Sequence, residues 1–592
     1  MVMILEGAEE YKRNYVVAIP LGIVGVIIAA IYYYGTKPNI FQFVLVDIAL
    51  FLSMFLLFMM LSYTGEKSKL YGLEDVIKRL PAVSKPKGHV HFKWKLIWTA
   101  TALILYFALT NIFIFGLNTK NEIDLFSSYR AIMAGAQGTL MQLGIGPIVT
   151  GSIIMQLFAG AKIVNLDLSD DNDQAIYQGV QKLLVIIMIF VEAIPQVYGF
   201  LSPQPSLVTA INKHYPGMGA SLADLIIISQ IAIGSYIVFL LDEVVSKWGI
   251  GSGVSLFIAA GVSQAIFNGT FNWVPATSSQ ALSLNNPPSG TIPKTIYAFQ
   301  HINASNMSSG GMSMIFLRYP NPIIYLIGTI AIFFAVAYAE STRIELPLAH
   351  TTARGARGRY PIKLLYASNI PVILMSALLA NVSMFSLLLW NNPSLKNLPL
   401  IGHQWWIGSY PNPNAITTPG ISPSTPMTGG AYYLSQVNGL ETWLLPLINP
   451  SLYSSYLFGH TYYQVLAHVL IYLIAMVVGS IIFAKFWIET TNMGPEAVAE
   501  QIESSGMQIP GFRRDPRVLK KVLERYIPAV TILSGALVGA LAAIADMIGT
   551  VGNASGTGVL LTVGIVIQLY EAIGKEQMME MHPLLRGFFG GT

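Results

Sequence analysis

The sequence predicts an all-α protein that crosses a membrane many times. Hydrophobic residues make up 53% of the 592 residues and charged residues only 11%, whereas soluble domains carry roughly 25% charged residues. Several runs are apolar over the roughly 20 residues that a helix needs to cross a bilayer. Lys and Arg fall almost entirely in alternate loops between these runs, as is typical of polytopic membrane proteins.

Hydropathy predicts about twelve membrane spans. They lie near residues 15–34, 41–63, 96–116, 141–159, 180–200, 222–241, 254–271, 321–340, 365–390, 463–484, 526–547 and 556–574. If the first residues are inside, the inner loops hold 26 of the 34 Lys and Arg residues and the outer loops hold seven. This excess predicts that both termini are cytoplasmic. Two long outer loops, 272–320 and 391–462, are rich in Pro, Gly, Ser and Asn, and the second is long enough to contain small ordered elements.

Two predicted spans begin with glycines. One starts with Gly144-Ile145-Gly146-Pro147 and the other with Gly249-Ile250-Gly251-Ser252-Gly253. Glycine weakens a helix by about 1 kcal/mol per residue, and irregular backbone at membrane depth is tolerated only beside protein or a water-filled cavity. We therefore expect both segments to line a path through the protein. The alternative is close helix packing through small residues.

Three further features are ambiguous from the residues alone. The segment 125–135 is too short and too polar to cross a membrane, so it is either a re-entrant or surface helix or an ordinary outer loop. Asp47 and Glu192 are acidic residues within apolar runs. An acidic residue inside a membrane is a functional candidate, but it is often just hydrogen-bonded to a neighbouring helix.

No enzymatic motif is present. The chain has no cysteine, no phosphate-binding loop, no metal-spaced His cluster and no nucleophile elbow, so we expect neither catalysis nor a cofactor or metal. A secondary solute transporter is the rival class, and it would need several paired charges at the midplane. The candidates are few: Asp47, Glu192 and Asp546. A purely structural scaffold is a third option, disfavoured by the glycine-started helices.

Several long segments, in order along the chain, resemble the SecY protein-conducting channel family, archaeal type. They are GTLMQLGIGPIVTGSIIMQL (138–157), LDEVVSKWGIGSGVSLFIAAGVSQAIF (241–267), ESTRIELPLAH (340–350), YPIKLLYASNIPVILMSALLANVSMF (360–385), FWIETTNMGPEAVA (486–499), GFRRDPRVLKKVLERYIP (511–528) and GTGVLLTVGIVIQLYE (556–571). The resemblance covers about residues 72–592. The two predicted spans within 1–65 are a departure from the family.

The resemblance implies a ten-helix inverted-repeat channel in the cell membrane, with halves at 66–318 and 319–592 and the two extra helices in 1–65. It implies a central pore subunit that passes unfolded secretory polypeptides across the membrane. It also implies that transmembrane segments are released laterally into lipid through a gate between the halves.

The resemblance assigns roles to particular residues. The pore ring is Ile145, Val149, Val254, Ile258, Ile373 and Leu561. The plug is Leu125, Phe126, Ser127, Ser128, Tyr129, Arg130, Ala131, Ile132, Met133, Ala134 and Gly135. The lateral gate polar cluster is Thr150, Glu192 and Asn381. Two ring pairs are spaced i,i+4 and so share a helix face, although ordinary core packing would give the same spacing. The polar cluster has a plain alternative in an interhelical hydrogen bond without a gating role.

The resemblance also implies partners. Inner-loop arginines would dock the ribosome: Arg354, Arg357, Arg359, Arg513, Arg514 and Arg517. Basic loops bind RNA phosphate without reading sequence, but positive charge also holds loops inside whatever the partner. The other implied partners are a SecE-type clamp subunit, often a second small one-helix subunit, unfolded precursor polypeptides and signal sequences, and membrane lipid.

Overall fold

The computed structural model describes most of the chain from Lys69 to Met581. Outside the described residues are 1–68, 89, 119–129, 161–163, 165, 167, 169, 200, 277–280, 285, 303–311, 351–356, 367–368, 392–403, 412–422, 458, 492, 505–506, 509–515 and 582–592. The predicted spans at 15–34 and 41–63, together with Asp47, therefore lie outside the described part of the chain.

Nine helices in the described residues are long and apolar enough to cross a membrane. They are α4 (Phe92–Leu109), α6 (Asp171–Gly199), α8 (Gly219–Trp248), α9 (Gly253–Phe271), α13 (Ile323–Ser341), α14 (Ile370–Asn391), α18 (Tyr462–Thr490), α20 (Pro516–Ile548) and α21 (Gly556–Met581). A tenth apolar helix, α5 (Gly146–Gly160), is shorter. These ten correspond to the ten later spans predicted from hydropathy.

The connecting segments contain short helices. They are η1 (Lys69–Leu73), α3 (Glu74–Arg79), α7 (Pro205–His214), α10 (Thr291–His301), α12 (Met312–Phe316), α15 (Gly429–Leu434), η4 (Leu440–Thr442), α16 (Leu445–Ile448), α17 (Pro450–Tyr453), η5 (Ser454–Leu457), α19 (Pro495–Ser504) and η6 (Val551–Asn553). Both long loops thus contain ordered pieces, whereas the sequence predicted them only for the second loop.

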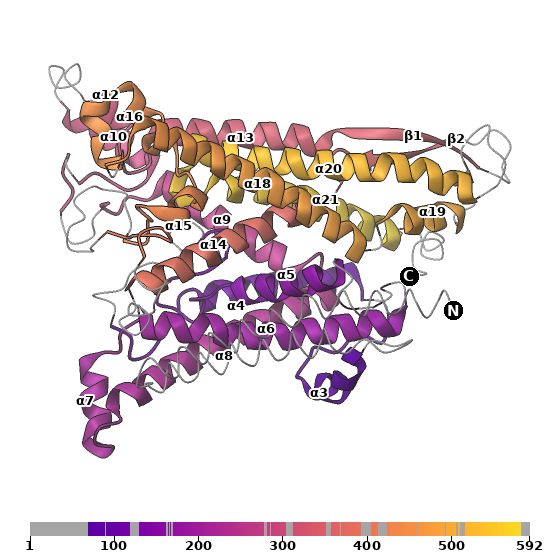
Figure 1. The fold of residues 1–592 in the computed structure, drawn as a ribbon, viewed down its shortest axis with the longest axis horizontal. Coiled ribbons are helices and arrows are strands. Elements are labelled where there is room, and N and C mark those ends of the chain that lie inside the picture. The colour runs from indigo at the N-terminus through magenta and orange to yellow at the C-terminus, as the bar shows by residue number, and fades with distance from the viewer. Residues whose placement is uncertain are drawn as a thin grey trace.

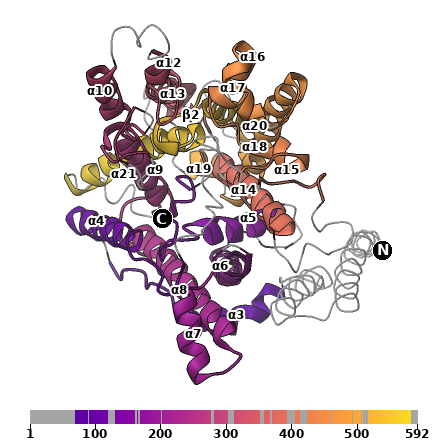
Figure 2. The ribbon, with the colours of Figure 1, turned by 90° about the vertical axis from the view of Figure 1, so that its left-hand side faces the viewer.

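The long helices run roughly side by side in two groups (Figure 1). Helices α4, α6 and α8 lie in one group, and α13, α18, α20 and α21 lie in the other. Helix α14 packs against both α5 and α18, and α9 packs against both α8 and α21. Figure 2 looks along most of the helices, and α5, α9 and α14 lie near the centre of that view. The central helices are therefore α14 and the two helices that begin with glycines, α5 and α9.

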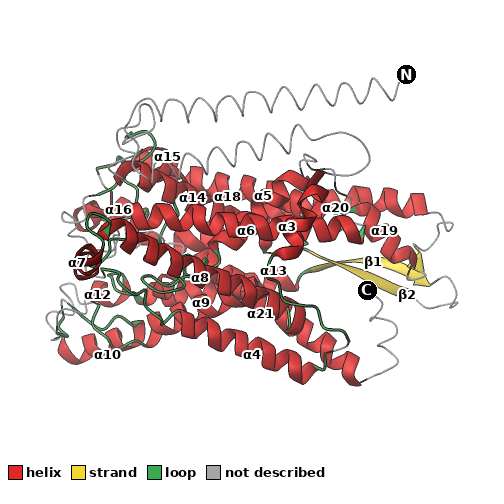
Figure 3. Cartoon of the chain, turned by 90° about the horizontal axis from the view of Figure 1, so that it is seen from below, coloured by secondary structure: helices red, strands yellow, loops and turns green. Residues whose placement is uncertain are grey.

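A small antiparallel sheet extends the bundle at one end, which we call the sheet end (Figure 3). Strand β1 (Arg343–His350) pairs with β2 (Arg357–Lys363) from Arg343–Lys363 to Ala349–Arg357, and with β3 (Met507–Gln508) through its last two residues. The all-α prediction is confirmed for the membrane-crossing part, and the sheet is an addition that the loops make outside it. Hydropathy does not detect these strands because they lie in polar loops.

The base of the β1–β2 hairpin is attached to α21. The Glu571 carboxylate accepts hydrogen bonds from Arg343 Nη2 at 3.0 Å and Lys363 Nζ at 2.6 Å. Arg343 begins β1 and Lys363 ends β2, so a single carboxylate closes the open end of the hairpin. The hairpin therefore projects from the bundle while its base is fixed to a membrane-length helix.

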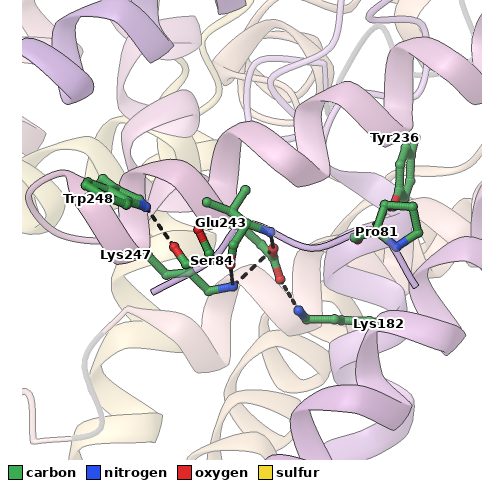
Figure 4. A network of polar contacts seen from close by, with 8 residues as sticks. Pro81, Ser84, Lys182, Tyr236, Glu243, Lys247 and Trp248 are labelled. Atoms are coloured by element: carbon green, nitrogen blue, oxygen red, sulfur yellow. Dashed lines mark hydrogen bonds and ion pairs between the residues drawn. The ribbon is translucent and has the colours of Figure 1, made fainter. Parts of the chain in front are cut away.

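Residues 80–84 form an extended strap that lies against α6 and α8 (Figure 4). The Glu243 side chain, 7% exposed, accepts a hydrogen bond from Val83 N at 2.7 Å and pairs with Lys182 and Lys247. Lys247 Nζ also donates to the Val83 carbonyl. Tyr236 Oη and Trp248 Nε1 donate to two further strap carbonyls, those of Pro81 and Ser84. The strap thus joins α3 to the bundle through its backbone.

The buried carboxylate of Glu243 should be important for stability. Glu243→Gln leaves two lysines without their counter-charge, so we expect the free energy of unfolding to fall by about 2 kcal/mol or more. Glu74→Gln is the matched control, because its partner Lys78 is on the exposed surface of α3. Thermal unfolding of the purified protein measures both. Equal stability of the two variants would contradict this role of the strap network.

Candidate channel constriction

Six aliphatic side chains from four central segments meet in one hydrophobic cluster. Ile145 directly precedes α5, and Val149 lies in its first turn; Val254 and Ile258 begin α9. Ile373 lies in the first turn of α14 and Leu561 in the second turn of α21. Five of the six are at most 5% exposed, and Val254 packs against the same cluster while partly open. The six residues that the resemblance grouped thus share the core cluster of the bundle, in which many other residues also lie, and their arrangement as a ring stays a prediction.

A polar cavity of about 490 Å³ borders this cluster on the side of the sheet end. Three of the six aliphatic residues, Val149, Val254 and Ile373, form part of its wall. Most of the polar wall is uncharged: Ser152, Gln156, Gln174, Tyr177, Gln178, Gln181, Ser252, Ser255, Thr490 and Thr491. Among the described residues that line it, Asp242 is the one charged group. The cavity is therefore lined by aliphatic side chains, by uncharged polar side chains and by the single carboxylate of Asp242.

The segment 130–135 packs against the start of α5. Ile145 N donates to the Met133 carbonyl at 2.8 Å, and Tyr106 Oη donates to the Ala134 carbonyl at 3.3 Å. Ile132, Met133 and Ala134 belong to the same hydrophobic cluster as the six aliphatic residues. Residues 125–129 of the predicted plug lie outside the described residues. The described part of that segment is therefore in direct contact with Ile145.

Gly144 is required by this contact. Its φ is +57°, which only glycine adopts at little cost, and a Cβ at this position would lie 2.1 Å from the Met133 carbonyl oxygen. The glycine therefore brings the α5 backbone against residues 130–135. Of the two interpretations of the glycine-started spans, the close approach of backbone is observed here, and the lining of a path stays a prediction.

The second glycine-started helix is held by a carboxylate. Gly251 has a φ of +80°, and a Cβ on Gly253 would lie 2.5 Å from the Asp242 Cα. Asp242, near the end of α8, accepts a hydrogen bond from Val254 N at 2.9 Å. Reasoning from the sequence missed Asp242, which lies seven residues, about two helical turns, before the glycine-rich stretch, and no local sequence signal points to its role.

A polar cluster joins α5 and α6 to α14. Thr150 Oγ1 donates to Glu192 Oε1 at 2.9 Å, and Asn381 Nδ2 donates to Thr150 Oγ1 at 3.1 Å. Glu192 is only 2% exposed. Its other carboxylate oxygen, Oε2, would lie 2.8 Å from a Cβ placed on Gly146, so a glycine is needed at that position. The three residues of the predicted cluster are therefore connected, and Glu192 has a partner.

The predicted docking arginines are described only in part. Arg357 and Arg359 are residues of β2, and Arg517 lies in the first turn of α20. Arg354, Arg513 and Arg514 lie outside the described residues. In the part of the chain that the structure describes, no three His, Cys, Asp or Glu side chains cluster as metal ligands would.

This arrangement defines a class of protein. Membrane-length helices surround a shared aliphatic core, which borders an internal cavity and is in contact with the segment 130–135. A solute transporter would instead gather paired charges there. Asp546, one of the acidic residues considered for such a site, is hydrogen-bonded to Thr557 and Tyr472 within the protein. The site is that of a polytopic membrane channel.

Comparison with known proteins identifies the family. The SecY family model matches residues 139–570, and a model described as the plug domain of Sec61p matches residues 104–138. The protein translocase subunit SecY of Halobacterium salinarum is 44% identical over 87% of this chain and 98% of its own length. That of Archaeoglobus fulgidus is 44% identical over 88% of this chain and 99% of its own. A solved structure described as a protein conducting channel has a TM-score of 0.65 at 38% identity, covering 86% of this chain and 98% of its own. The chain belongs to the SecY family, and it is a channel subunit rather than an enzyme.

The role of Gly144 can be tested by comparison with a second glycine that also has a positive φ. Gly144→Ala introduces both a strained φ and a clash with the Met133 carbonyl, so we expect the free energy of unfolding to fall by more than about 2 kcal/mol. Gly217 also has a positive φ, +84°, but a Cβ there would have no atom within 4 Å. Gly217→Ala should therefore lower the free energy of unfolding by a smaller amount, which reflects the strained φ alone. Thermal unfolding compares the two, and equal losses would show that the contact with Met133 is dispensable.

Proposed function

We propose that this chain is the central pore subunit of a protein translocation channel, through which unfolded secretory polypeptides cross the membrane and from which transmembrane segments enter the lipid sideways. The observation that supports this proposal is that six aliphatic residues from four central segments share one core cluster, and that three of them, Val149, Val254 and Ile373, line a cavity inside the bundle. The relatives, which are named as protein translocase subunits, support it. A secretory precursor translocated by the reconstituted channel, with small solutes excluded, is the direct test.

The chemistry of the constriction fits a polypeptide substrate of any sequence. A channel for such a substrate must fit many side chains and bind none of them tightly. Aliphatic groups satisfy this because they make no directional bonds and exclude water when they are in contact. Most of the polar side chains of the cavity wall suit the same task, since the Ser, Thr and Gln side chains can hydrogen-bond to a passing chain and carry no charge; Asp242 is the exception.

The segment 125–135 is proposed as the plug that fills the outer side of the constriction at rest. The contact of its described part with Ile145 supports this, and so does a solved relative described as a SecY protein whose plug domain stabilises the closed state. That structure has a TM-score of 0.64 at 38% identity, over 86% of this chain and 98% of its own. Displacing the segment would break the Ile145–Met133 hydrogen bond and open the constriction from that side.

The cluster of Thr150, Glu192 and Asn381 is proposed as a latch of the lateral gate. Its support is that it connects α5 and α6, which belong to the proposed first half (66–318), to α14 of the proposed second half (319–592). A transmembrane segment leaving sideways would separate these helices. The hydrogen bond from Asn381 to Thr150, which joins the two halves, would then break, while the Thr150–Glu192 bond within the first half could persist.

The sheet end is proposed to face the cytoplasm, with the chain in the plasma membrane and both termini inside. The 26 Lys and Arg residues of the inner loops support this orientation. The extension 1–65, with its two predicted spans, is proposed to lie outside the inverted repeat.

Arg354, Arg357, Arg359, Arg513, Arg514 and Arg517 are proposed to dock the ribosome. Two features support this: the β1–β2 hairpin projects from the sheet end, and Arg357 is located where the hairpin turns. A relative at 38% identity with a TM-score of 0.63, covering 86% of this chain and 98% of its own, is described as Sec61 in a ribosome–channel complex. A SecE-type clamp subunit, a second small one-helix subunit, signal sequences and membrane lipid are the further proposed partners.

The seal can be tested at two of its most buried residues. Replacing both Ile145 and Ile258 with Asn places polar groups at the constriction, so we expect resting ion conductance in planar bilayers to rise at least about tenfold. Replacing both with Leu keeps the site aliphatic and should leave conductance near the wild-type value. Unchanged conductance in a folded, partner-bound Asn variant would remove these residues from the seal.

Ribosome docking can be tested by charge reversal. Replacing both Arg357 and Arg513 with Glu should weaken ribosome binding by at least about tenfold, and wild-type binding should fall steeply as salt rises. Lys213 on α7 is the control, because it is exposed at the opposite end of the molecule. Lys213→Glu should bind as the wild type does. Binding that ignores both salt and the double reversal would exclude the basic loops as the docking surface.

A further inference from the structure

The last membrane-length helix of each proposed half begins in the same way. Helix α9 follows α8 through a glycine-rich turn, and α21 follows α20 through another. Asp242 of α8 accepts a hydrogen bond from Val254 N, 12 residues further on, at 2.9 Å. Asp546 of α20 accepts one from Thr557 N, 11 residues further on, at 2.8 Å. In both cases a carboxylate near the end of one helix caps the start of the next.

In each half, a threonine from the first membrane-length helix also holds the glycine-rich turn through a second hydrogen bond. Thr99 of α4 accepts a hydrogen bond from Ile250 N at 3.0 Å, and Thr329 of α13 accepts one from Val551 N at 3.1 Å. The donors Ile250 and Val551 both lie in the glycine-rich turns. Each turn is thus held by one Asp and one Thr from two different helices of its own half.

Glycine makes both attachments possible. A Cβ on Gly253 would lie 2.5 Å from the Asp242 Cα, and a Cβ on Gly556 would lie 2.0 Å from the backbone carbon of Ala545. The two helix starts therefore approach the preceding helix backbone to backbone. Asp546 is held more firmly than Asp242, since its second oxygen also accepts from Thr557 Oγ1 at 2.6 Å and from Tyr472 Oη at 2.7 Å.

The spacing connects these attachments to the constriction. Ile258 lies four residues after Val254, and Leu561 lies four residues after Thr557. Each of these aliphatic residues is therefore about one helical turn beyond a fixed N–H group. A rigid start of this kind sets both the height and the rotation of the side chain that follows it.

We propose that Asp242 and Asp546 are matching positioning residues, which hold the starts of α9 and α21 so that Ile258 and Leu561 meet in the constriction. This inference rests on the proposed function only in taking the constriction as the seal. Each Asp acts on its own helix, so its loss should displace one aliphatic residue and leave the other in place. A general contribution to stability would not show this selectivity.

The chain contains no cysteine, so an introduced thiol is a unique probe. The experiment uses the complete channel with its partners, carrying either Ile258→Cys or Leu561→Cys, and measures the rate of modification by a membrane-impermeant thiol reagent. Asp242→Ala should raise the rate at position 258 about fivefold, the effect of losing a helix cap, and leave the rate at position 561 unchanged. Asp546→Ala should do the reverse. Asp→Asn keeps an acceptor oxygen and should restore much of the wild-type rate at each site.

Asp224 near the other end of α8 provides the control, and Asp224→Ala should change neither rate. If an Asp→Ala variant does not fold, Thr99→Val and Thr329→Val remove only the second attachment and should give the same selectivity on a smaller scale. Equal changes at both positions, or no change in a folded variant, would overturn the proposal. Measuring the ion conductance of the same proteins distinguishes the positioning role of the two Asp residues from the role of the constriction as a seal. Selective changes in modification rate at constant conductance would support the positioning role and count against the seal.

Discussion

The structure depends on one constraint, which is that backbone polar groups at membrane depth must find partners inside the protein. A helix that begins within the bundle leaves several N–H groups without intrahelical partners. Here the N–H of Ile145 bonds to the Met133 carbonyl, and those of Val254 and Thr557 bond to buried carboxylates. The glycines follow from the same constraint, because these partners can approach only where no Cβ intervenes. A channel interior can then be built from helix starts rather than from unbroken helices.

Two kinds of polar contact follow, and they differ in what they connect. The bonds of Asp242 and Asp546 lie within one group of helices and fix helix starts. The bond from Asn381 to Thr150 instead connects α14 of one half to α5 of the other. A movement between the groups would break the second kind and preserve the first. The aliphatic cluster makes no directional bonds, so its side chains can separate and come together again without breaking any hydrogen bond.

The sheet end and the constriction share a helix. Glu571 fixes the base of the β1–β2 hairpin, and it lies on α21, which also carries Leu561. Helix α21 is also attached to α4, because Lys95 Nζ of α4 donates a hydrogen bond to the Glu576 carboxylate of α21 at 2.6 Å. A partner bound to the hairpin would therefore act on a helix that reaches the constriction, without an intervening flexible loop.

The sequence by itself determined the membrane class, the ten described spans and the glycine-started helices, because hydropathy and backbone cost are local properties. The resemblance then grouped the six aliphatic residues, but their meeting in one cluster depends on four segments that are far apart along the chain. Asp242 and Asp546 show the limit most clearly. In the sequence Asp546 was only an acidic residue in a span, and Asp242 was not singled out. What each does depends on which N–H group lies beside its carboxylate, and the tertiary structure alone decides that, because the partners come from separate helices across a turn.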